Sequence, residues 1–428
     1  MLRQLKTRRS LATTVALFSL AIFSMLWIGR SGRIAEAAPA LAIRGGKLPQ
    51  QDDDLPRPPA PPSWRDELDW SRVREDGGGY VQVLKDGGRA ELTIDPRLQH
   101  EVERVLAGER SPYAAVVLLS VDDGRVLAMA GRSHAEPELD AGDLALKPWA
   151  PAASIFKLVT ASALIEGGVG PQSRVCYHDG VHSVEASNLR SYPRLDRDCR
   201  SLAFGVAKSQ NAIIARLAND HLSPLALART AHALGFGQPL PLELPVAPSE
   251  AQVPAAHGLE FARVSAGFWS TTLSPLHGAY LAATLARGGV TPPLRLVDRV
   301  VDRDGNAQRP DAAMAERVIS EDAARAVGQM MVGTTEYGTA RLGFHDRRSG
   351  RPLLPGVAVA GKTGSLNRAA PFLAYSWFVG FAPAERPEVA IAVLLGNGQD
   401  WHKKAHQVAA EVLTGYFHGV PSLRLAAR

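Results

Sequence analysis

The sequence predicts a mixed α/β protein of the α+β kind, with one long apolar segment near its N-terminus. Alanine-rich, helix-forming segments occur around 154–165 and 201–215, whereas the small and β-branched residues at 357–365 predict a strand. The 428 residues are 46% hydrophobic and 21% charged, which is typical of a globular chain. The net charge is only +5, and no tract of Lys or Arg interleaved with aromatic residues follows the N-terminus. A nucleic-acid partner is therefore not expected.

The apolar segment covers residues 11–29 and contains no charged residue. It is long enough to cross a bilayer as a helix. The segment 1–10 carries four Lys or Arg residues, so we expect it to be a cytoplasmic tail and the rest of the chain to be exported. The alternative is a cleaved signal peptide, with Ala35-Glu36-Ala37 as the cleavage site. The apolar run is longer than the usual core of a signal peptide, which favours a transmembrane anchor.

Residues 30–85 are predicted to be a Pro-rich extracytoplasmic linker. Six prolines and three consecutive aspartates lie between Pro49 and Pro62, a composition that cannot build a core. Trp64 and Trp70 follow and are candidates for docking the linker onto the folded part, while Gly77-Gly78-Gly79 is interpreted as a further break. The folded domain is then expected over 86–420.

The first motif of chemical interest is Ser154-Ile155-Phe156-Lys157, an S-x-x-K pattern at the start of a predicted helix. Residues three apart share a helix face, so the hydroxyl and the amine would meet. A lysine whose pKa is lowered by burial and neighbouring cations can take the proton of the serine, which makes the serine a nucleophile. The alternative is a helix-capping serine beside a solvated lysine.

The second motif is Ser209-Gln210-Asn211, an S-x-N pattern with apolar flanks. These flanks place it at the inner end of a buried helix or on a turn between two helices. Polar groups there need partners: the Ser209 hydroxyl can relay a proton, and the Asn211 amide can bind another amide. The alternative is a core turn that satisfies its own polar groups.

The third motif is Lys362-Thr363-Gly364, followed by Ser365, at the end of the predicted strand 357–365. Gly361 and Gly364 allow another backbone to approach closely, as when a peptide adds to a sheet edge. Lys362 supplies a charge, and Thr363 and Ser365 supply hydroxyls for a carboxylate. The alternative is an ordinary basic strand edge.

Taken together and in this order, the three motifs resemble those of the penicillin-binding protein transpeptidase domain, whose relatives include the serine β-lactamases. The resemblance extends over about residues 90–417. Further similar segments lie at 92–99, at 115–129, at Gly338-Thr339-Ala340 before the third motif, and at 376–381 and 389–394. It implies a β-lactamase/transpeptidase-like fold: an antiparallel sheet flanked by helices, one of them C-terminal, beside a mostly helical lobe. Ser154 would then lie in the cleft between the two lobes.

The resemblance also implies a peptidoglycan D,D-transpeptidase or D,D-carboxypeptidase that D-Ala-D-Ala stem peptides and β-lactams acylate. Ser154 would be the nucleophile, Lys157 its general base and Ser209 the proton relay to the leaving amine. Lys362 would tune the electrostatics around Ser209. Four residues would bind substrate: Asn211 through an amide, Thr363 through the terminal carboxylate, and Gly364 and Ser365 along the strand edge. The backbone N–H of Ser365, with that of Ser154, would form the oxyanion hole.

No cofactor is implied. The expected partners are stem peptides, β-lactams and the membrane, in which the chain would be single-pass with its catalytic domain on the periplasmic side. The segment between the membrane and the domain is too short for a glycosyltransferase domain, so a separate glycosyltransferase is a candidate partner.

Two departures from the family pattern bear on this interpretation. Ala152-Ala153 stands where many members have Pro-Gly before the serine. The E-x-x-L-N motif of class A β-lactamases is missing, since the nearest string begins at Glu185 and lacks the leucine. The S-x-N motif argues against class D β-lactamases.

Three alternatives to a transpeptidase remain. A serine β-lactamase would share the site but would deacylate penicillin quickly, and a β-lactam sensor would share it as well. The third is a catalytically silent scaffold that binds cell-wall synthases. The complete set of motif residues argues against the scaffold.

The chain has two cysteines, Cys176 and Cys199. An exported compartment permits a disulfide between them, and two separate buried thiols are the alternative. His178 and His182 lie nearby, but no metal site is predicted. His402 and His406 have the spacing of a metal-binding pair on a helix, although a surface helix face is the favoured interpretation.

Overall fold

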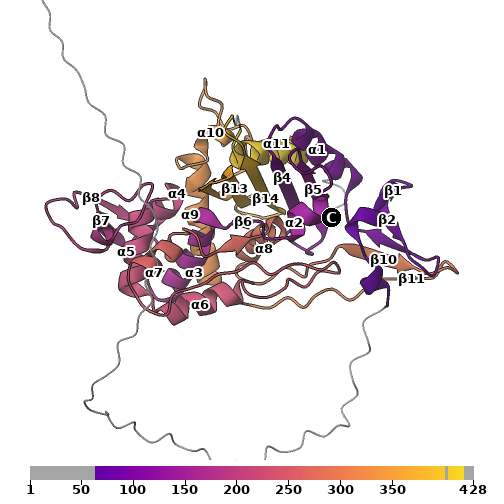
Figure 1. The fold of residues 1–428 in the computed structure, drawn as a ribbon, viewed down its shortest axis with the longest axis horizontal. Helices are drawn as coiled ribbons and strands as arrows, with labels where there is room; N and C mark the ends of the chain where they lie inside the picture. The colour runs from indigo at the N-terminus through magenta and orange to yellow at the C-terminus, as the bar shows by residue number, and fades with distance from the viewer. Residues whose placement is uncertain (1–62, 401–402, 419–428) are drawn as a thin grey trace, which may run out of the picture. The chain divides into compact units, whose positions relative to one another are not determined.

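The computed structural model describes residues 63–400 and 403–418 (Figure 1). The predicted cytoplasmic tail, the segment 11–29 and residues 30–62 of the predicted linker lie outside the described residues, as does His402. Within the described part of the chain, no helix combines the length and the apolarity that crossing a membrane requires.

A five-stranded antiparallel sheet lies at the centre of the fold, and its strands are nearly all buried. The C-terminal hairpin and the first long hairpin of the chain pair side by side in it, through β14 and β4. One edge is formed by β12, which carries the third motif. In spatial order the strands are β12 (Ala360–Ala369), β13 (Phe372–Ala382), β14 (Val389–Asn397), β4 (Tyr113–Ser120) and β5 (Val126–Ser133).

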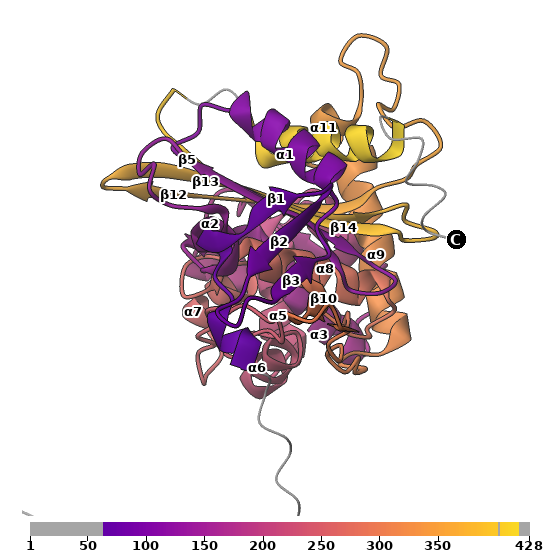
Figure 2. The ribbon, with the colours of Figure 1, turned by 90° about the vertical axis from the view of Figure 1, so that its right-hand side faces the viewer.

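Helices cover both faces of this sheet, as Figure 2 shows. On one face lie α1 (Pro96–Ala107) and α11 (Ala405–His418), which pack on each other and on the strands. On the other face α8 (Pro275–Ala286) packs against β4, β13 and β14. Nearly every residue of α8 is buried, because the helix lies between the sheet and further helices. The short helix α2 (Ala141–Leu146) also packs on this sheet.

A mostly helical region adjoins the α8 face of the sheet and carries the first two motifs. Capping side chains begin several of its helices: the Ser223 hydroxyl accepts the N–H of Ala226, and the Ser320 hydroxyl accepts that of Ala323. The helices are α3 (Lys157–Glu166), α4 (Leu202–Ala207), α5 (Asn211–His221), α6 (Pro224–Ala233), α7 (Leu259–Ser265) and α9 (Glu321–Glu336), with the single turns η3 (Ala153–Phe156) and η4 (Ala186–Leu189). The short helix α10 (Arg341–Phe344) follows α9 and packs against it and against α11. Two small ribbons complete it: β6 (Ala150–Pro151) with β9 (Thr272–Leu273), and β7 (Arg174–Tyr177) with β8 (Asp198–Ser201).

A second five-stranded sheet corrects the predicted domain boundary. The linker is predicted to reach residue 85, but secondary structure is present from Ser63 onward. Leu68 and Leu84 are buried, and Trp64 and Trp70 pack against the core. Gly77 and Gly78, interpreted as a break, have positive φ and form the turn of a hairpin. The elements are η1 (Ser63–Glu67), η2 (Trp70–Arg72), β1 (Arg74–Asp76), β2 (Gly79–Val83), β3 (Arg89–Leu92), β10 (Val297–Val301) and β11 (Ala307–Gln308).

The predicted α+β fold with an antiparallel sheet flanked by helices is confirmed. The strand expected at 357–365 is β12, which begins at Ala360 and continues to Ala369. The helix expected from Ser154 begins with the 3₁₀ turn η3 and becomes α-helical at Lys157.

Candidate active site

Ser154 lies in the short turn η3 that leads into α3. The residue before it, Ala153, has a φ of 49°, in the left-handed region that favours glycine. Its carbonyl packs on Gly267, where an added Cβ would overlap it. This sharp turn leaves the Ser154 side chain partly exposed while its neighbours Ala153 and Ile155 are fully buried.

Lys157 begins α3 and is fully buried, with three oxygens around its amine. Its Nζ atom lies 2.6 Å from Ser154 Oγ, 2.6 Å from Asn211 Oδ1 and 2.7 Å from the Ala266 carbonyl. Burial, and next the positive charge of Lys362, hold the pKa of Lys157 well below its usual range. A neutral amine has two N–H groups and one lone pair. The two N–H groups can go to Asn211 and Ala266, which leaves the lone pair for the Ser154 hydroxyl.

The Asn211 amide is oriented by a second contact. Its Nδ2 donates to the Val181 carbonyl over 2.8 Å, so its Oδ1 faces Lys157. Asn211 is the first residue of α5, and it is buried. The amide orientation therefore depends on the position of the chain around Val181.

Ser209 lies on the turn between α4 and α5 with a φ of 56°. Lys362 donates to Ser209 Oγ over 2.9 Å and to the Thr363 carbonyl over 2.8 Å. Lys362 is fully buried, and burial lowers its pKa to about 7. Lys362 can therefore give up or take back a proton near neutral pH, next to the hydroxyl of Ser209.

The third motif lies on β12, whose other edge pairs with no strand of its sheet. Thr363 Oγ1 lies 2.5 Å from Thr339 Oγ1, so two hydroxyls meet beside this edge. Gly364 packs closely on Ile155 and Trp377, which leaves little room for a side chain. Ser365 is exposed. An exposed edge of this kind can accept an extended peptide.

A cleft of about 500 Å³ opens onto these groups. Ser154, Ser209, Thr363 and Ser365 line it together with Thr339. Its described lining also includes two lysines and two histidines, Lys208, Lys404, His182 and His406, and no Asp or Glu. The cleft is therefore suited to an anionic substrate.

The structure brings Ser154, Lys157, Ser209, Asn211, Lys362 and Thr363 to one site, with Gly364 and Ser365 on the adjoining strand. Three contributors were missed: the carbonyls of Ala266 and Val181, and the hydroxyl of Thr339. Backbone carbonyls carry no signal in the residue type. For Thr339, the similarity of Gly338-Thr339-Ala340 to the family was the available signal.

Cys176 and Cys199 are joined by a disulfide between β7 and β8, and neither cysteine lines the cleft. Within the described ranges no group of three or more His, Cys, Asp or Glu residues could hold a metal ion. His406 does not lie on a surface helix face as expected. It is buried at the start of α11, where burial lowers its pKa to about 4. The reason is that α11 packs on the sheet, and its first turn faces the cleft.

The fold and the paired serine–lysine centre define a class of active-serine enzymes in which a lysine of low pKa lies one turn after the nucleophile. The family model described as penicillin binding protein transpeptidase domain matches residues 114–414. The chain belongs to this family.

Individual relatives agree with this assignment. The peptidoglycan D,D-transpeptidase PbpA of Mycobacterium tuberculosis is 28% identical over 349 residues, which cover 73% of this chain and 68% of the relative. The peptidoglycan D,D-transpeptidase FtsI of Escherichia coli is 25% identical and is matched over 59% of its length by 81% of this chain. Among solved structures, the imipenem acyl-enzyme complex of penicillin-binding protein A from M. tuberculosis superposes with a TM-score of 0.64. Its identity is 25%, and the match covers 78% of this chain and 80% of that one.

Proposed function

We propose that this protein is a peptidoglycan D,D-transpeptidase, with D,D-carboxypeptidase activity where water replaces the acceptor amine. The observation that carries the proposal is the Lys157 amine, fully buried and 2.6 Å from the hydroxyl of Ser154. Burial lowers the pKa of Lys157, so the amine gives up its proton more readily and can act as a base toward Ser154. The family membership and the names of the relatives support the same activity.

In the acylation step, the Ser154 hydroxyl gives its proton to Lys157 while Oγ attacks the carbonyl of the penultimate D-Ala. Asn211 and the Ala266 carbonyl hold the two N–H groups of the amine, so its lone pair is directed at Ser154. The leaving D-Ala takes a proton through Ser209, which Lys362 contacts. Thr363 would bind the terminal carboxylate, and the N–H groups of Ser154 and Ser365 would stabilise the oxyanion. An amine or water then attacks the acyl-enzyme.

The domain assignment and location form part of the proposal. The catalytic domain covers 63–418, preceded by a tether over 30–62 and a membrane anchor over 11–29 that leaves 1–10 in the cytoplasm. The charge-free, apolar composition of 11–29 supports the anchor. The substrates are D-Ala-D-Ala stem peptides, with β-lactams as inhibitors, and a separate glycosyltransferase would supply the glycan strands.

Labelling with fluorescent penicillin tests the proposal. Wild-type protein should form a stable adduct on the peptide that contains Ser154, and Ser154→Ala should remain folded and unlabelled. An adduct on Ser209 would contradict the assignment of the nucleophile. Multiple penicillin turnovers per second would reject the transpeptidase and favour a β-lactamase, whereas a persistent adduct with D-Ala release from a stem-peptide mimic supports the proposal.

A further inference from the structure

A buried arginine lies behind the second motif. Arg216 is on α5, five residues after Asn211, and its side chain is only 4% exposed. Its guanidinium donates to the carbonyls of Asn188, of Cys176 over 2.5 Å and of Arg190 over 2.7 Å. It also binds both carboxylate oxygens of Asp196, over 2.8 and 3.0 Å. One side chain thus fixes four points of the segment 176–196.

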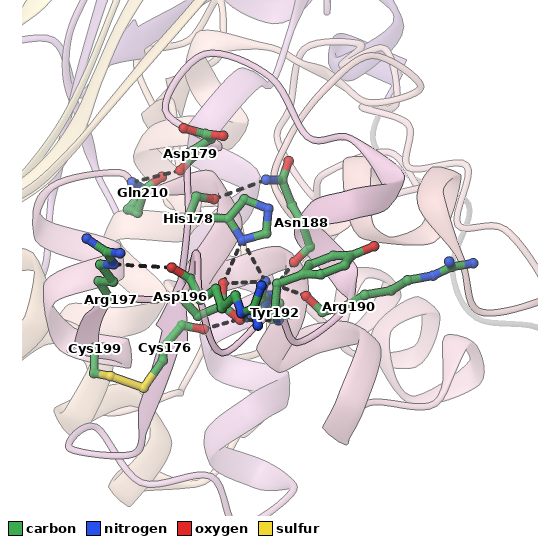
Figure 3. A network of polar contacts seen from close by, with 12 residues as sticks. Cys176, His178, Asp179, Asn188, Arg190, Tyr192, Asp196, Arg197, Cys199 and Gln210 are labelled. Atoms are coloured by element: carbon green, nitrogen blue, oxygen red, sulfur yellow. Dashed lines mark hydrogen bonds and ion pairs between the residues drawn. A yellow bond between two sulfur atoms is a disulfide. The ribbon is translucent and has the colours of Figure 1, made fainter.

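The partner carboxylate is equally enclosed. The Asp196 side chain is 3% exposed, and besides Arg216 it contacts His178 Nδ1 over 2.6 Å and accepts the N–H of Tyr192 over 2.8 Å. Figure 3 shows Asp196 at the centre of this network, with the disulfide beside it. A buried ion pair rarely stabilises a fold more than well-packed apolar residues would. Stability alone therefore does not account for it.

The segment that Arg216 fixes supplies acceptors to the second motif. Its Val181 carbonyl accepts Asn211 Nδ2 over 2.8 Å, and its Asp179 carbonyl lies 3.5 Å from Gln210 Nε2. Residues 178–185 contain no helix or strand. Their path is therefore held by side-chain contacts. Asn188 Nδ2 donates to the His178 carbonyl, and Arg263 Nε donates to the Val184 carbonyl over 2.9 Å. Arg216 holds the chain on either side of the stretch, through the carbonyls of Cys176 and Asn188.

We propose that Arg216 and Asp196 are positioning residues for the acylation centre: they hold the Val181 carbonyl where it orients the Asn211 amide toward Lys157. Without that acceptor the amide is free to turn. A turned amide presents an N–H group to Lys157 and competes for the lone pair that the Ser154 hydroxyl needs. The inference rests on the proposed acylation of Ser154.

The fold offers a way to separate positioning from folding. The disulfide and the β7–β8 pairing tie the two ends of the segment independently of Arg216. Arg197 provides a matched control. It directly follows Asp196 and is exposed, and its described side-chain hydrogen bond goes to the Arg194 carbonyl.

The experiment measures the second-order rate constant of penicillin acylation against pH, together with the unfolding midpoint. The variants are Arg216→Met, Arg216→Lys, the double variant Arg216→Met/Asp196→Asn, and Arg197→Met. For Arg216→Met we expect the rate to fall by roughly 10- to 100-fold, the size of effect that a displaced catalytic geometry produces. The acidic limb of the pH–rate profile should move to lower pH. The ammonium form of Lys157 loses the Asn211 acceptor while Lys362 still faces it, so the pKa of Lys157 falls further. Arg216→Lys should lie between wild type and Arg216→Met, and Arg197→Met should match wild type.

The double variant decides between positioning and a merely structural role. It leaves no unpaired buried charge, so its unfolding midpoint should recover relative to Arg216→Met while acylation stays slow. It also removes the carboxylate that faces His178, so the variant is compared with Arg216→Met and not with wild type alone. A folded Arg216→Met or double variant with the wild-type rate and an unmoved acidic limb would overturn the proposal. If the wild type itself is not acylated, the proposed function fails instead.

Discussion

Lys157 and Lys362 are both fully buried, and the positive charge of Lys362 adds to burial in lowering the pKa of Lys157. The two amines have different neighbours: Lys157 contacts Ser154 and Asn211, and Lys362 contacts Ser209. Burying two lysines without a carboxylate partner costs folding free energy. The site therefore keeps reactive amines at the expense of stability.

That cost should be measurable at Lys362. Its pKa in the folded state is about 7, below the value of 10.5 for an unperturbed lysine. Between these values the unfolded state binds more protons, so the free energy of unfolding rises with pH across the window from about 7 to 10.5. Lys362→Met should remove this dependence. It should be more stable than wild type at pH 6 to 7 by on the order of 4 kcal/mol, with the gain shrinking toward pH 10.

Denaturant midpoints across this pH range provide the measurement. Lys85→Met is the control, because Lys85 is exposed and its loss should leave the pH dependence as in wild type. Parallel stability curves for Lys362→Met and wild type would show that Lys362 is not held at a lowered pKa.

Ala153 offers a test of backbone strain at the nucleophile. An L-residue in the left-handed region costs about 1 to 2 kcal/mol, whereas glycine avoids this cost but loses about 0.5 to 1 kcal/mol of chain entropy on folding. Ala153→Gly should therefore raise the free energy of unfolding by about 0.5 to 1 kcal/mol. Ala152→Gly is the matched control, since Ala152 has a φ of −61° and should only lose stability. Equal destabilisation by both variants in chemical denaturation would exclude strain at Ala153.

The sequence indicated which candidate side chains lie together better than it indicated the backbone groups that hold them. The candidates Ser154, Lys157, Ser209, Asn211 and Lys362 could be found because each motif places its side chains through local geometry, on one helical turn, one turn between helices or one strand. The Val181 and Ala266 carbonyls could not be found, since every residue type has a backbone carbonyl and only the tertiary structure brings these two to the site.

In the fold, too, elements with a local sequence pattern were predictable and elements that depend on tertiary contacts were not. The long apolar strands of the central sheet were predictable from their composition. The hairpin at 74–83 was not predictable, because its strands are short, β1 is exposed and β2 is mostly half-buried, and its Gly77-Gly78 turn was taken for a break. The hairpin is held because β2 pairs with β3, a contact that no local pattern reveals.

Thr363 should determine the affinity for a terminal carboxylate. A hydrogen bond to a charged group contributes about 1.5 to 3 kcal/mol, so Thr363→Val should slow penicillin acylation by roughly 10- to 100-fold. Thr363→Ser keeps the hydroxyl and should stay near wild type. Thr339→Val should have a smaller effect, because Thr339 contacts Thr363 and acts through it.

Penicillin methyl ester is the discriminating probe. It lacks the free carboxylate, so the acylation rates of wild type and Thr363→Val should differ little with it. If Thr363→Val slows acylation by penicillin and by its ester equally, Thr363 does not bind the carboxylate.

Gly267 lies between the backbone of the nucleophile and an acceptor of the base Lys157. Replacing it should lower the acylation rate by more than the loss of stability explains. It follows Ala266, whose carbonyl lies 2.7 Å from Lys157 Nζ, and it packs against the carbonyl of Ala153 next to Ser154. A Cβ at Gly267 would overlap that carbonyl and push the two chains apart. Gly267→Ala should thus displace both Ser154 and the acceptor of Lys157, and acylation should fall by about 100-fold, the loss expected from a shift of about 1 Å.

Gly237→Ala is the control for this experiment. Gly237 has nearly the same φ, 78° against 84° for Gly267, but an added Cβ there meets no atom within 4 Å. Both variants take an alanine into the left-handed region, at a cost of about 1 kcal/mol or more. Only Gly267→Ala should also lose acylation, measured as the rate of penicillin labelling of folded protein. If the two variants label at the same rate, the contact between Gly267 and Ala153 does not set the geometry of the nucleophile.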